Sequence, residues 1–182
     1  MKDHIVVSLR ITVVLLVITC GIYPALVWLV GQVAFRHQAN GSLITRNGRI
    51  IGSELIAQNF ASDRYFHSRL SAIDYDGANS GGSNLGPTSK KLAERIAGDV
   101  QKSGARPLPA DSVTTSGSGL DPHISPENAF LQAQRVAAAR KVDEQRLRAL
   151  ISKRTEPRFL GVYGERRVNV LLLNLDLDGG VF

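Results

Sequence analysis

The sequence has few residues of the kinds that build metal centres or covalent catalytic sites. Its one cysteine is Cys20, and its histidines outside the N-terminal tail are His37, His67 and His123. It contains no Cys-x-x-Cys pair, no His-Glu-x-x-His helix, no Gly-x-Ser-x-Gly elbow and no Gly-x-x-x-x-Gly-Lys-Ser/Thr phosphate loop. We therefore expect no metal site, no intrinsic cofactor and no catalytic residue in this chain.

The composition also argues against a nucleic-acid partner. The 22 lysines and arginines outnumber the 16 acidic residues and give a net charge of +6, but they form no basic tract. Aromatic residues make up 6% of the chain. Nucleic-acid binding needs clustered basic side chains, so we expect no nucleic acid among the partners. The positive charge instead fits a solvated surface close to anionic lipid.

Charged side chains are missing from one long segment. None occurs from Ile11 to Phe35, and arginines flank the run on both sides. As a helix it would be about 37 Å long at ~1.5 Å per residue, enough to cross a hydrocarbon core about 30 Å thick. It is too long for a signal peptide, and no small-x-small cleavage site follows it. We therefore expect a lipid-contacting chain with a short N-terminal tail (1–10), a transmembrane helix (11–35) and one soluble domain (36–182).

The middle of this span favours contact with other helices. Pro24 lacks an N–H group and should kink or loosen the helix, which membrane helices tolerate when neighbouring groups compensate. Tyr23 and Trp28 lie away from the ends, where interfacial aromatic residues usually occur. Gly21 offers a small surface for close approach. We expect Gly21, Tyr23, Pro24 and Trp28 to pack on partner helices, the alternative being a simple lipid-facing tether.

Neither charge nor cysteine content fixes the orientation of the span. Lys2 and Arg10 precede the span, while Arg36, Arg46 and Arg49 follow it, so the positive-inside rule is nearly balanced. The single cysteine lies inside the span, and the soluble domain therefore has no disulfide. A soluble domain without a disulfide can lie on either side of the membrane.

Residues 36–182 predict a single α+β domain with a small sheet and about three helices. Asn47-Gly48 between two apolar runs is typical of a type I′ hairpin turn. Ser125-Pro126-Glu127 and Asp143 are typical helix starts. The expected strands are 42–46, 49–53, 113–115, 158–163 and 167–175. The expected helical segments are one or two turns at 54–60 and helices from about 88 to Gly104, 126–141 and 143–154.

Two loops rich in glycine and serine are the candidate binding site. Each precedes a predicted helix, so backbone N–H groups there could hold a nucleotide phosphate. Contact with a partner protein is the other interpretation. We favour it, because a loop rich in glycine and serine is by itself only weak evidence of nucleotide binding. With two polar residues that follow them, the candidate residues are Ser80, Gly81, Gly82, Ser83, Asn84, Ser116, Gly117, Ser118, Gly119, Asp121 and His123.

The second loop permits a third interpretation. A serine nucleophile, His123 as base and Asp121 as orienting acid would make a membrane-tethered hydrolase. A turn shaped by Asp121-Pro122 explains the same residues, because serine and glycine are common in turns. We favour the turn and keep the hydrolase, or a nucleotide-binding module, as the alternative function.

Short motifs spread along the chain carry a family resemblance. The motifs are YPALVW at 23–28, GSELI at 52–56, YFHSR at 65–69, SGGSNLGPTS at 80–89, VTTSGSGLDPHISPE at 113–127 and EPRFLGVYGE with RVNVLLLNLDLD within 156–178. In this order and spacing they resemble the KdpC family, the C subunits of the bacterial Kdp potassium-transporting ATPase complex. One departure is Leu70, where we would expect a proline.

The resemblance implies a non-catalytic accessory subunit of a bacterial inner-membrane complex that takes up K⁺ at the expense of ATP. The implied partners are the P-type ATPase catalytic subunit and the channel-like potassium-binding subunit. The implied role is to stabilise assembly and to act as a catalytic chaperone that raises the pump's ATP affinity, or to assist ion entry. This chain has neither a Asp-Lys-Thr-Gly-Thr phosphorylation motif nor a Thr-Val-Gly-Tyr-Gly-like filter, which agrees with an accessory role.

The resemblance also implies a cytoplasmic N-terminus and a periplasmic soluble domain. A periplasmic domain cannot touch cytoplasmic ATP. ATP is therefore expected to act only through the complex, with K⁺ as the transported ion. In that orientation the two loops are structural or contact a partner.

Overall fold

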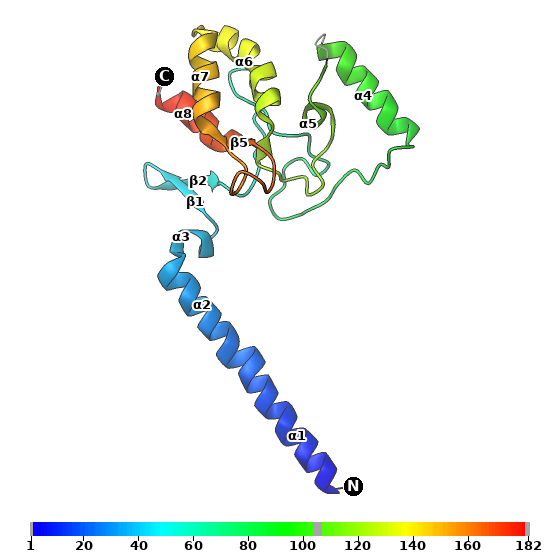
Figure 1. Ribbon diagram of the computed structural model, residues 1–182, viewed down its shortest axis with the longest axis vertical. Coiled ribbons are helices and arrows are strands. Elements are labelled where there is room, and N and C mark those ends of the chain that lie inside the picture. Colours follow the sequence, from blue (N-terminus) through cyan, green and yellow to red (C-terminus); the bar gives the residue numbers. More distant parts are fainter. Residues whose placement is uncertain (1, 104–106, 181–182) are drawn as a thin grey trace. The chain divides into compact units, whose positions relative to one another are not determined.

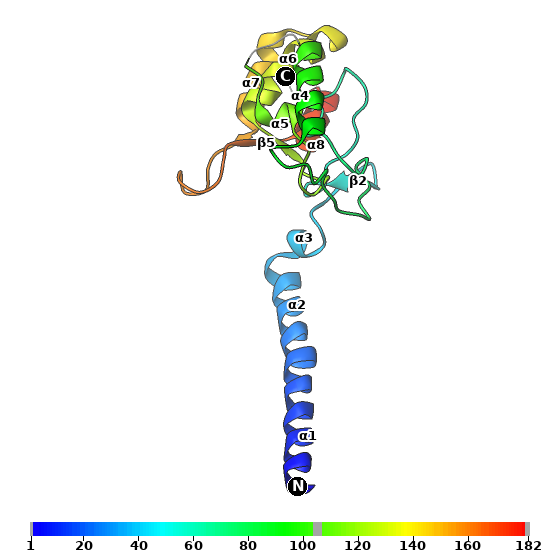
Figure 2. The same cartoon turned by 90° about the vertical axis from the view of Figure 1, so that its right-hand side faces the viewer.

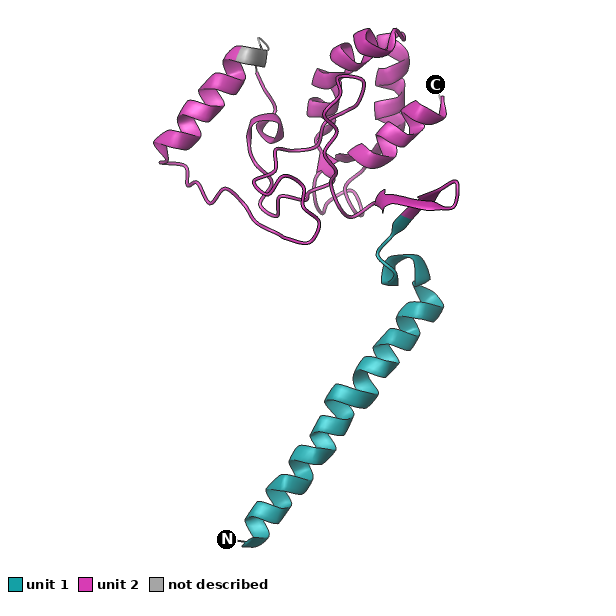
Figure 3. Ribbon diagram, turned by 180° about the vertical axis from the view of Figure 1, so that it is seen from behind, with its two compact units in different colours: residues 1–43 teal, residues 44–182 magenta. Residues whose placement is uncertain are grey.

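A computed structural model of the chain describes residues 2–103 and 107–180 (Figure 1). The chain divides into two compact units, residues 1–43 and residues 44–182, coloured separately in Figure 3. The described fold combines one long apolar helix with small sheets and several further helices, as the sequence predicts.

Unit 1 is built around a helix that runs through Lys2–Ala34 and is long and apolar enough to cross a membrane. It consists of α1 (Lys2–Leu16), a π-helical segment (Val17–Ile22) and α2 (Tyr23–Ala34), and the short α3 (Arg36–Ala39) follows. Residues 2–10, expected to be a tail, thus continue the helix. The Tyr23 N–H group donates to the Ile18 carbonyl, five residues back, directly before Pro24. The predicted loosening at Pro24 takes the form of this wider π turn.

Unit 2 begins within a β-hairpin made of β1 (Leu43–Arg46) and β2 (Arg49–Ser53). Asn47 and Gly48 between them both have positive φ, 52° and 74°, as a type I′ turn requires. The hairpin prediction is confirmed. The helical turns expected at 54–60 are wrong, because the Ala57 N–H group donates to the distant Leu120 carbonyl instead of to a helical neighbour.

The helices of unit 2 are partly those predicted. The predicted helices are confirmed as α4 (Lys90–Ser103), α6 (Pro126–Arg140) and α7 (Glu144–Arg154), although the predicted end at Gly104 lies outside the described residues. The strand predicted at 113–115 is wrong. Residues Ala110–Val113 form the short helix α5, and Thr115 makes an isolated parallel bridge with Leu70.

A second correction concerns the C-terminal strands. The predicted strand 167–175 is a strand only in β5 (Arg167–Asn169), after which Val170–Gly179 form helix α8. Segment 158–163 makes one isolated bridge, Phe159 with Tyr163, instead of a strand. The observed sheet is antiparallel with β5 between β3 (His123–Ile124) and β4 (Thr155–Glu156).

The core of unit 2 lies where α6, α7 and α8 meet the three-stranded sheet, as Figure 1 shows. Its members are apolar side chains shielded from water, and their burial supplies the main stabilisation of the unit. The largest fully buried apolar side chains are those of Phe66, Ile124, Leu147, Ile151, Leu173, Val136, Val168 and Val170.

Candidate functional site

The two glycine- and serine-rich loops lie side by side. The Gly81 N–H group donates to the Ser118 carbonyl at 2.9 Å, and the Ser80 hydroxyl donates to the same oxygen at 3.2 Å. Thr115, just before the second loop, donates to the Ser83 hydroxyl at 3.0 Å. The candidate residues of the two loops therefore form one feature. We call residues 80–84 and 116–119 together the paired loops.

At two positions in the paired loops the neighbouring chain lies so close that only glycine fits. A Cβ atom at Gly82 would lie 2.9 Å from the Gly117 carbonyl oxygen. A Cβ atom at Gly119 would lie 2.5 Å from Ile73 Cγ1 and 2.8 Å from the Gly81 carbonyl oxygen, and Gly119 also has a φ of +73°. All three distances are shorter than those of real Cβ contacts. These glycines therefore allow the loops to pack on each other, a role that needs no ligand.

The two serines of the second loop act as turn caps. Ser116 is buried, and its hydroxyl accepts from the Gly119 N–H group at 3.1 Å and from the Asp121 N–H group at 3.4 Å. The Ser118 hydroxyl lies 3.1 Å from that of Ser116 and accepts from the Leu120 N–H group. Within residues 2–103 and 107–180, no hydrogen bond joins either serine to His123. The described geometry thus has turn capping in place of a serine–histidine pair.

Asp121 is the centre of a small polar cluster. Its carboxylate accepts from Arg69 Nη1 at 3.1 Å and from the His123 N–H group at 3.0 Å, and His123 Nδ1 lies 3.7 Å from it. Burial alone would raise the pKa of the Asp121 carboxyl. The side chain and backbone amide of His123, together with Arg69, outweigh burial and hold that pKa below its ordinary value. Asp121 therefore stays ionised and ties the second loop to Arg69.

Asp111 is a structural residue that the sequence analysis missed. Its carboxylate accepts from the Ser125 N–H group at 2.7 Å, the Ser125 hydroxyl at 2.8 Å and the Asn128 side-chain amide at 3.1 Å. Ser125 itself caps α6 by accepting from the Asn128 N–H group. A carboxylate thus already occupies the N-terminus of α6, where a phosphate would otherwise be favoured. Asp111 lies 14 residues before Ser125 in the chain, so no local sequence pattern indicated this contact.

Asp121 and His123 line an open cleft of about 670 Å³. Side chains of both charge signs line it, namely the arginines at 69, 166 and 167 and the acidic residues Asp111, Asp121, Glu127 and Glu165. No group of three or more histidine, cysteine, aspartate or glutamate side chains in the described part of the chain could hold a metal ion. Small-molecule sites are usually enclosed and mostly apolar, whereas this cleft is open and lined by charges of both signs. It is therefore better suited to a polar contact with another protein.

The four span residues named from the sequence are all exposed in unit 1. Tyr23 and Trp28 each have 65% of their surface exposed, and a Cβ atom at Gly21 would meet no atom within 4 Å. Pro24 begins α2 directly after the π turn. Throughout the described span no residue is buried.

The described residues thus define a small α+β protein with one long apolar helix, in which the paired loops are joined by hydrogen bonds. The family model described as "K+-transporting ATPase, c chain" matches residues 5–179. Curated relatives carry the name potassium-transporting ATPase KdpC subunit. The chain is 49% identical to that of Koribacter versatilis, with 98% of this chain and 96% of the relative covered.

Two further relatives agree. The KdpC subunit of Synechocystis is 50% identical, with 98% of this chain and 99% of the relative covered, and that of Gemmatimonas aurantiaca is 51% identical, with 98% and 94% covered. The chain belongs to the KdpC family, the accessory C subunits of the potassium-transporting ATPase.

Proposed function

We propose that this chain is the accessory subunit of a bacterial inner-membrane complex that takes up K⁺ at the expense of ATP. In this proposal residues 11–35 span the membrane, residues 1–10 face the cytoplasm and residues 36–182 lie in the periplasm. K⁺ is the cargo of the complex. Family membership carries the proposal, and the helix Lys2–Ala34, long and apolar enough to cross a membrane, supports it.

The proposed partners are the P-type ATPase catalytic subunit and the channel-like potassium-binding subunit. A span with no buried residue and a π turn at its middle offers backbone and side-chain surface to other helices. We assign Gly21, Tyr23, Pro24 and Trp28 to that contact. Packing there would hold the subunits together and bring unit 2 to its partners.

The paired loops, with Asp121 and His123, are proposed to contact a partner protein and not a nucleotide. The N–H groups of Gly81, Gly119 and Leu120 already donate within the loops. A phosphate would have to displace those bonds, and the Asp111 carboxylate would repel it at the start of α6. Any rise in the ATP affinity of the pump is then transmitted through the catalytic subunit, without ATP touching this chain.

The proposed orientation predicts one pattern of thiol labelling. In a chain whose Cys20 is replaced by alanine, Ala149→Cys on the exposed surface of α7 should react with a membrane-impermeant maleimide in intact spheroplasts. Lys2→Cys should react only after lysis, because it is expected on the cytoplasmic side. The reverse pattern contradicts a periplasmic unit 2.

The proposed function predicts a conditional growth defect. In cells without other potassium uptake systems, deletion of this chain should abolish growth at limiting potassium and leave growth at ample potassium unchanged. The full chain supplied from a plasmid should restore growth. Unimpaired growth of the deletion strain at limiting potassium contradicts the proposal.

A further inference from the structure

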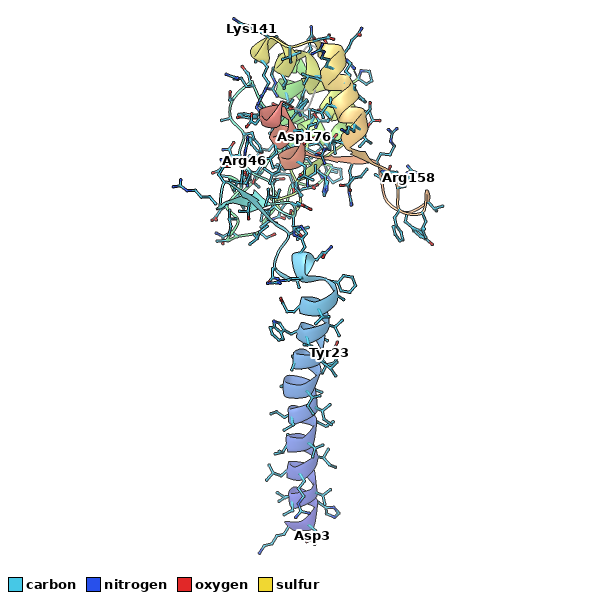
Figure 4. The ribbon with its side chains drawn as sticks, turned by 90° about the vertical axis from the view of Figure 1, so that its left-hand side faces the viewer. Asp3, Tyr23, Arg46, Lys141, Arg158 and Asp176 are labelled. Carbon is cyan, nitrogen blue, oxygen red and sulfur yellow. The ribbon has the colours of Figure 1, made fainter. Side chains whose placement is uncertain are left out.

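A cluster of apolar side chains is exposed on the segment between β4 and β5. We call Phe159, Leu160, Gly161, Val162 and Tyr163 the apolar turn. Its four large side chains have between 67% and 76% of their surface exposed. In Figure 2 the segment, coloured orange, projects from the rest of unit 2, and Figure 4 shows the same from another side, with Arg158 labelled at the start of the turn. Contiguous exposed apolar side chains of this kind mark interaction sites.

The backbone of the apolar turn is ordered by its own hydrogen bonds. Phe159 and Tyr163 exchange two N–H to carbonyl bonds of 2.8 and 2.9 Å, and the Val162 N–H group donates to the Phe159 carbonyl at 3.2 Å. An ion pair of 2.8 Å between Arg158 and Glu165 closes the base. Pre-ordering lowers the entropy that is lost when a segment binds.

Leu160 has a left-handed backbone inside a tight turn, in which Gly161 also has a positive φ, 74°. Its φ is +52°, which costs a bulky L-residue about 1–2 kcal/mol. Its side chain is 76% exposed, so burial within the unit does not offset this cost. A strained backbone that presents an apolar side chain to the outside is typical of a binding element.

The charges around the apolar turn favour a protein surface over an anionic bilayer. Arg158 is paired with Glu165, and Arg167 is paired with Glu156 at 2.8 Å. These pairs neutralise two of the three arginines in residues 156–167, and Arg166 leaves an excess of one positive charge. Attraction to anionic lipid needs a cluster of several basic residues. The apolar tip is therefore suited to a hydrophobic groove with a polar rim, the usual anatomy of a protein interface.

We propose that the apolar turn docks into an apolar groove on another subunit of the same potassium-transporting complex. This inference rests on the proposed function. Phe159 and Tyr163 are the anchors, because aromatic side chains carry much of the binding energy at protein interfaces. The Arg158–Glu165 pair forms the polar rim of the contact.

Photo-crosslinking in intact membranes tests the contact. A benzophenone-bearing phenylalanine analogue replaces Phe159, and the same analogue replaces Leu55, an exposed apolar residue outside the turn, as the matched control. The Phe159 probe should give a protein adduct whose second chain is another subunit of the complex. The Leu55 probe should not give that adduct.

Substitution of Phe159 and Tyr163 in the full chain gives a second test, in which binding to the other subunits is measured. Phe159→Ser with Tyr163→Ser should weaken binding of the chain to the other subunits roughly 30-fold or more, the effect of losing one or more hot-spot side chains. Unit 2 should stay folded, because both side chains are exposed, and hydrogen exchange of its core verifies this.

The outcomes separate the two proposals. A lipid adduct, or no adduct, from the Phe159 probe while the wild-type chain still co-purifies with the pump overturns the docking inference alone. Unchanged binding of the double-serine variant does the same. Failure of the wild-type chain to co-purify with any pump subunit overturns the proposed function, and the docking inference with it.

Discussion

Replacement of Asn174 by alanine is expected to lower the free energy of unfolding of unit 2 by about 3–5 kcal/mol, because it leaves two buried backbone groups unpaired at about 1–3 kcal/mol each and removes packed atoms. The Asn174 side chain is 2% exposed and lies on α8. Its amide donates to the Phe66 carbonyl at 2.9 Å, and its oxygen accepts from the Phe66 N–H group at 2.9 Å. These two bonds tie the irregular segment around Phe66 to the C-terminal helix.

Hydrogen exchange of the full chain in detergent is the suitable measurement. The single tryptophan, Trp28, lies in the span, so its fluorescence does not report on unit 2. Amides of core residues such as Leu147 and Ile151 should lose protection in Asn174→Ala. Gln145→Ala, at an exposed position of α7, is the matched control and should change stability by less than about 0.5 kcal/mol. Equal protection in both variants contradicts the structural role of Asn174.

Gly119→Ala is expected to destabilise unit 2 by about 2–4 kcal/mol, from the strain of a left-handed backbone and from overpacking. The new Cβ atom would lie 2.5 Å from Ile73 and 2.8 Å from the Gly81 carbonyl oxygen. The paired loops would have to separate, and the bond from the Gly81 N–H group to the Ser118 carbonyl would weaken. Local hydrogen exchange around residues 80–84 and 116–119 should rise first.

Gly117→Ala is the matched control, because the same loop carries it and its added Cβ atom would meet nothing within 4 Å. It should leave loop exchange close to that of the wild type. If both variants loosen the loops equally, close approach of the backbones is not what requires glycine at 119. If neither does, the two loops do not hold each other.

The parts of the fold that were predictable are those coded by neighbouring residues. Ser125 caps α6, and Asp143 caps α7 by accepting from the Gln145 N–H group. Asn47-Gly48 closes the hairpin with two positive φ values. Each signal acts within about one turn of chain, so the sequence predicts it without knowledge of the tertiary fold.

The C-terminal error has a physical reason. A short apolar run such as Val170–Leu173 fits a buried strand and a buried helix equally well, and periodicity does not separate them. Asn169, whose side chain accepts from the Leu172 N–H group, caps the observed helix. Packing decided between the two, since Leu173 and Leu177 of α8 are buried in the core with Ile151 of α7.

The candidate site residues were named from loop composition alone, and their function stays a prediction; their geometry could not be predicted from the sequence. The composition of both loops indicated a special role, and the structure joins them through Gly81 and Ser118. Gly81 and Ser118 are 37 residues apart in the chain, so no local sequence pattern predicts that the two loops pair. For the same reason the sequence did not predict the hydrogen bonds of Arg69 with Asp121 and of Ser125 with Asp111.

These contacts also give a physical meaning to the motifs that carry the family resemblance. Arg69 of the YFHSR motif binds Asp121 of the VTTSGSGLDPHISPE motif, and Phe66 binds Asn174 of the C-terminal motif. These contacts therefore join three of the motifs within unit 2.

The accessory role is tested most directly by purifying the pump from membranes with and without this chain and measuring K⁺-stimulated ATP hydrolysis. The chain should co-purify with the other subunits, hydrolysis should collapse without it, and adding it back should restore the rate. If instead the chain purifies alone as a stable, monodisperse protein while the pump hydrolyses ATP at the same rate without it, the accessory-subunit account is wrong.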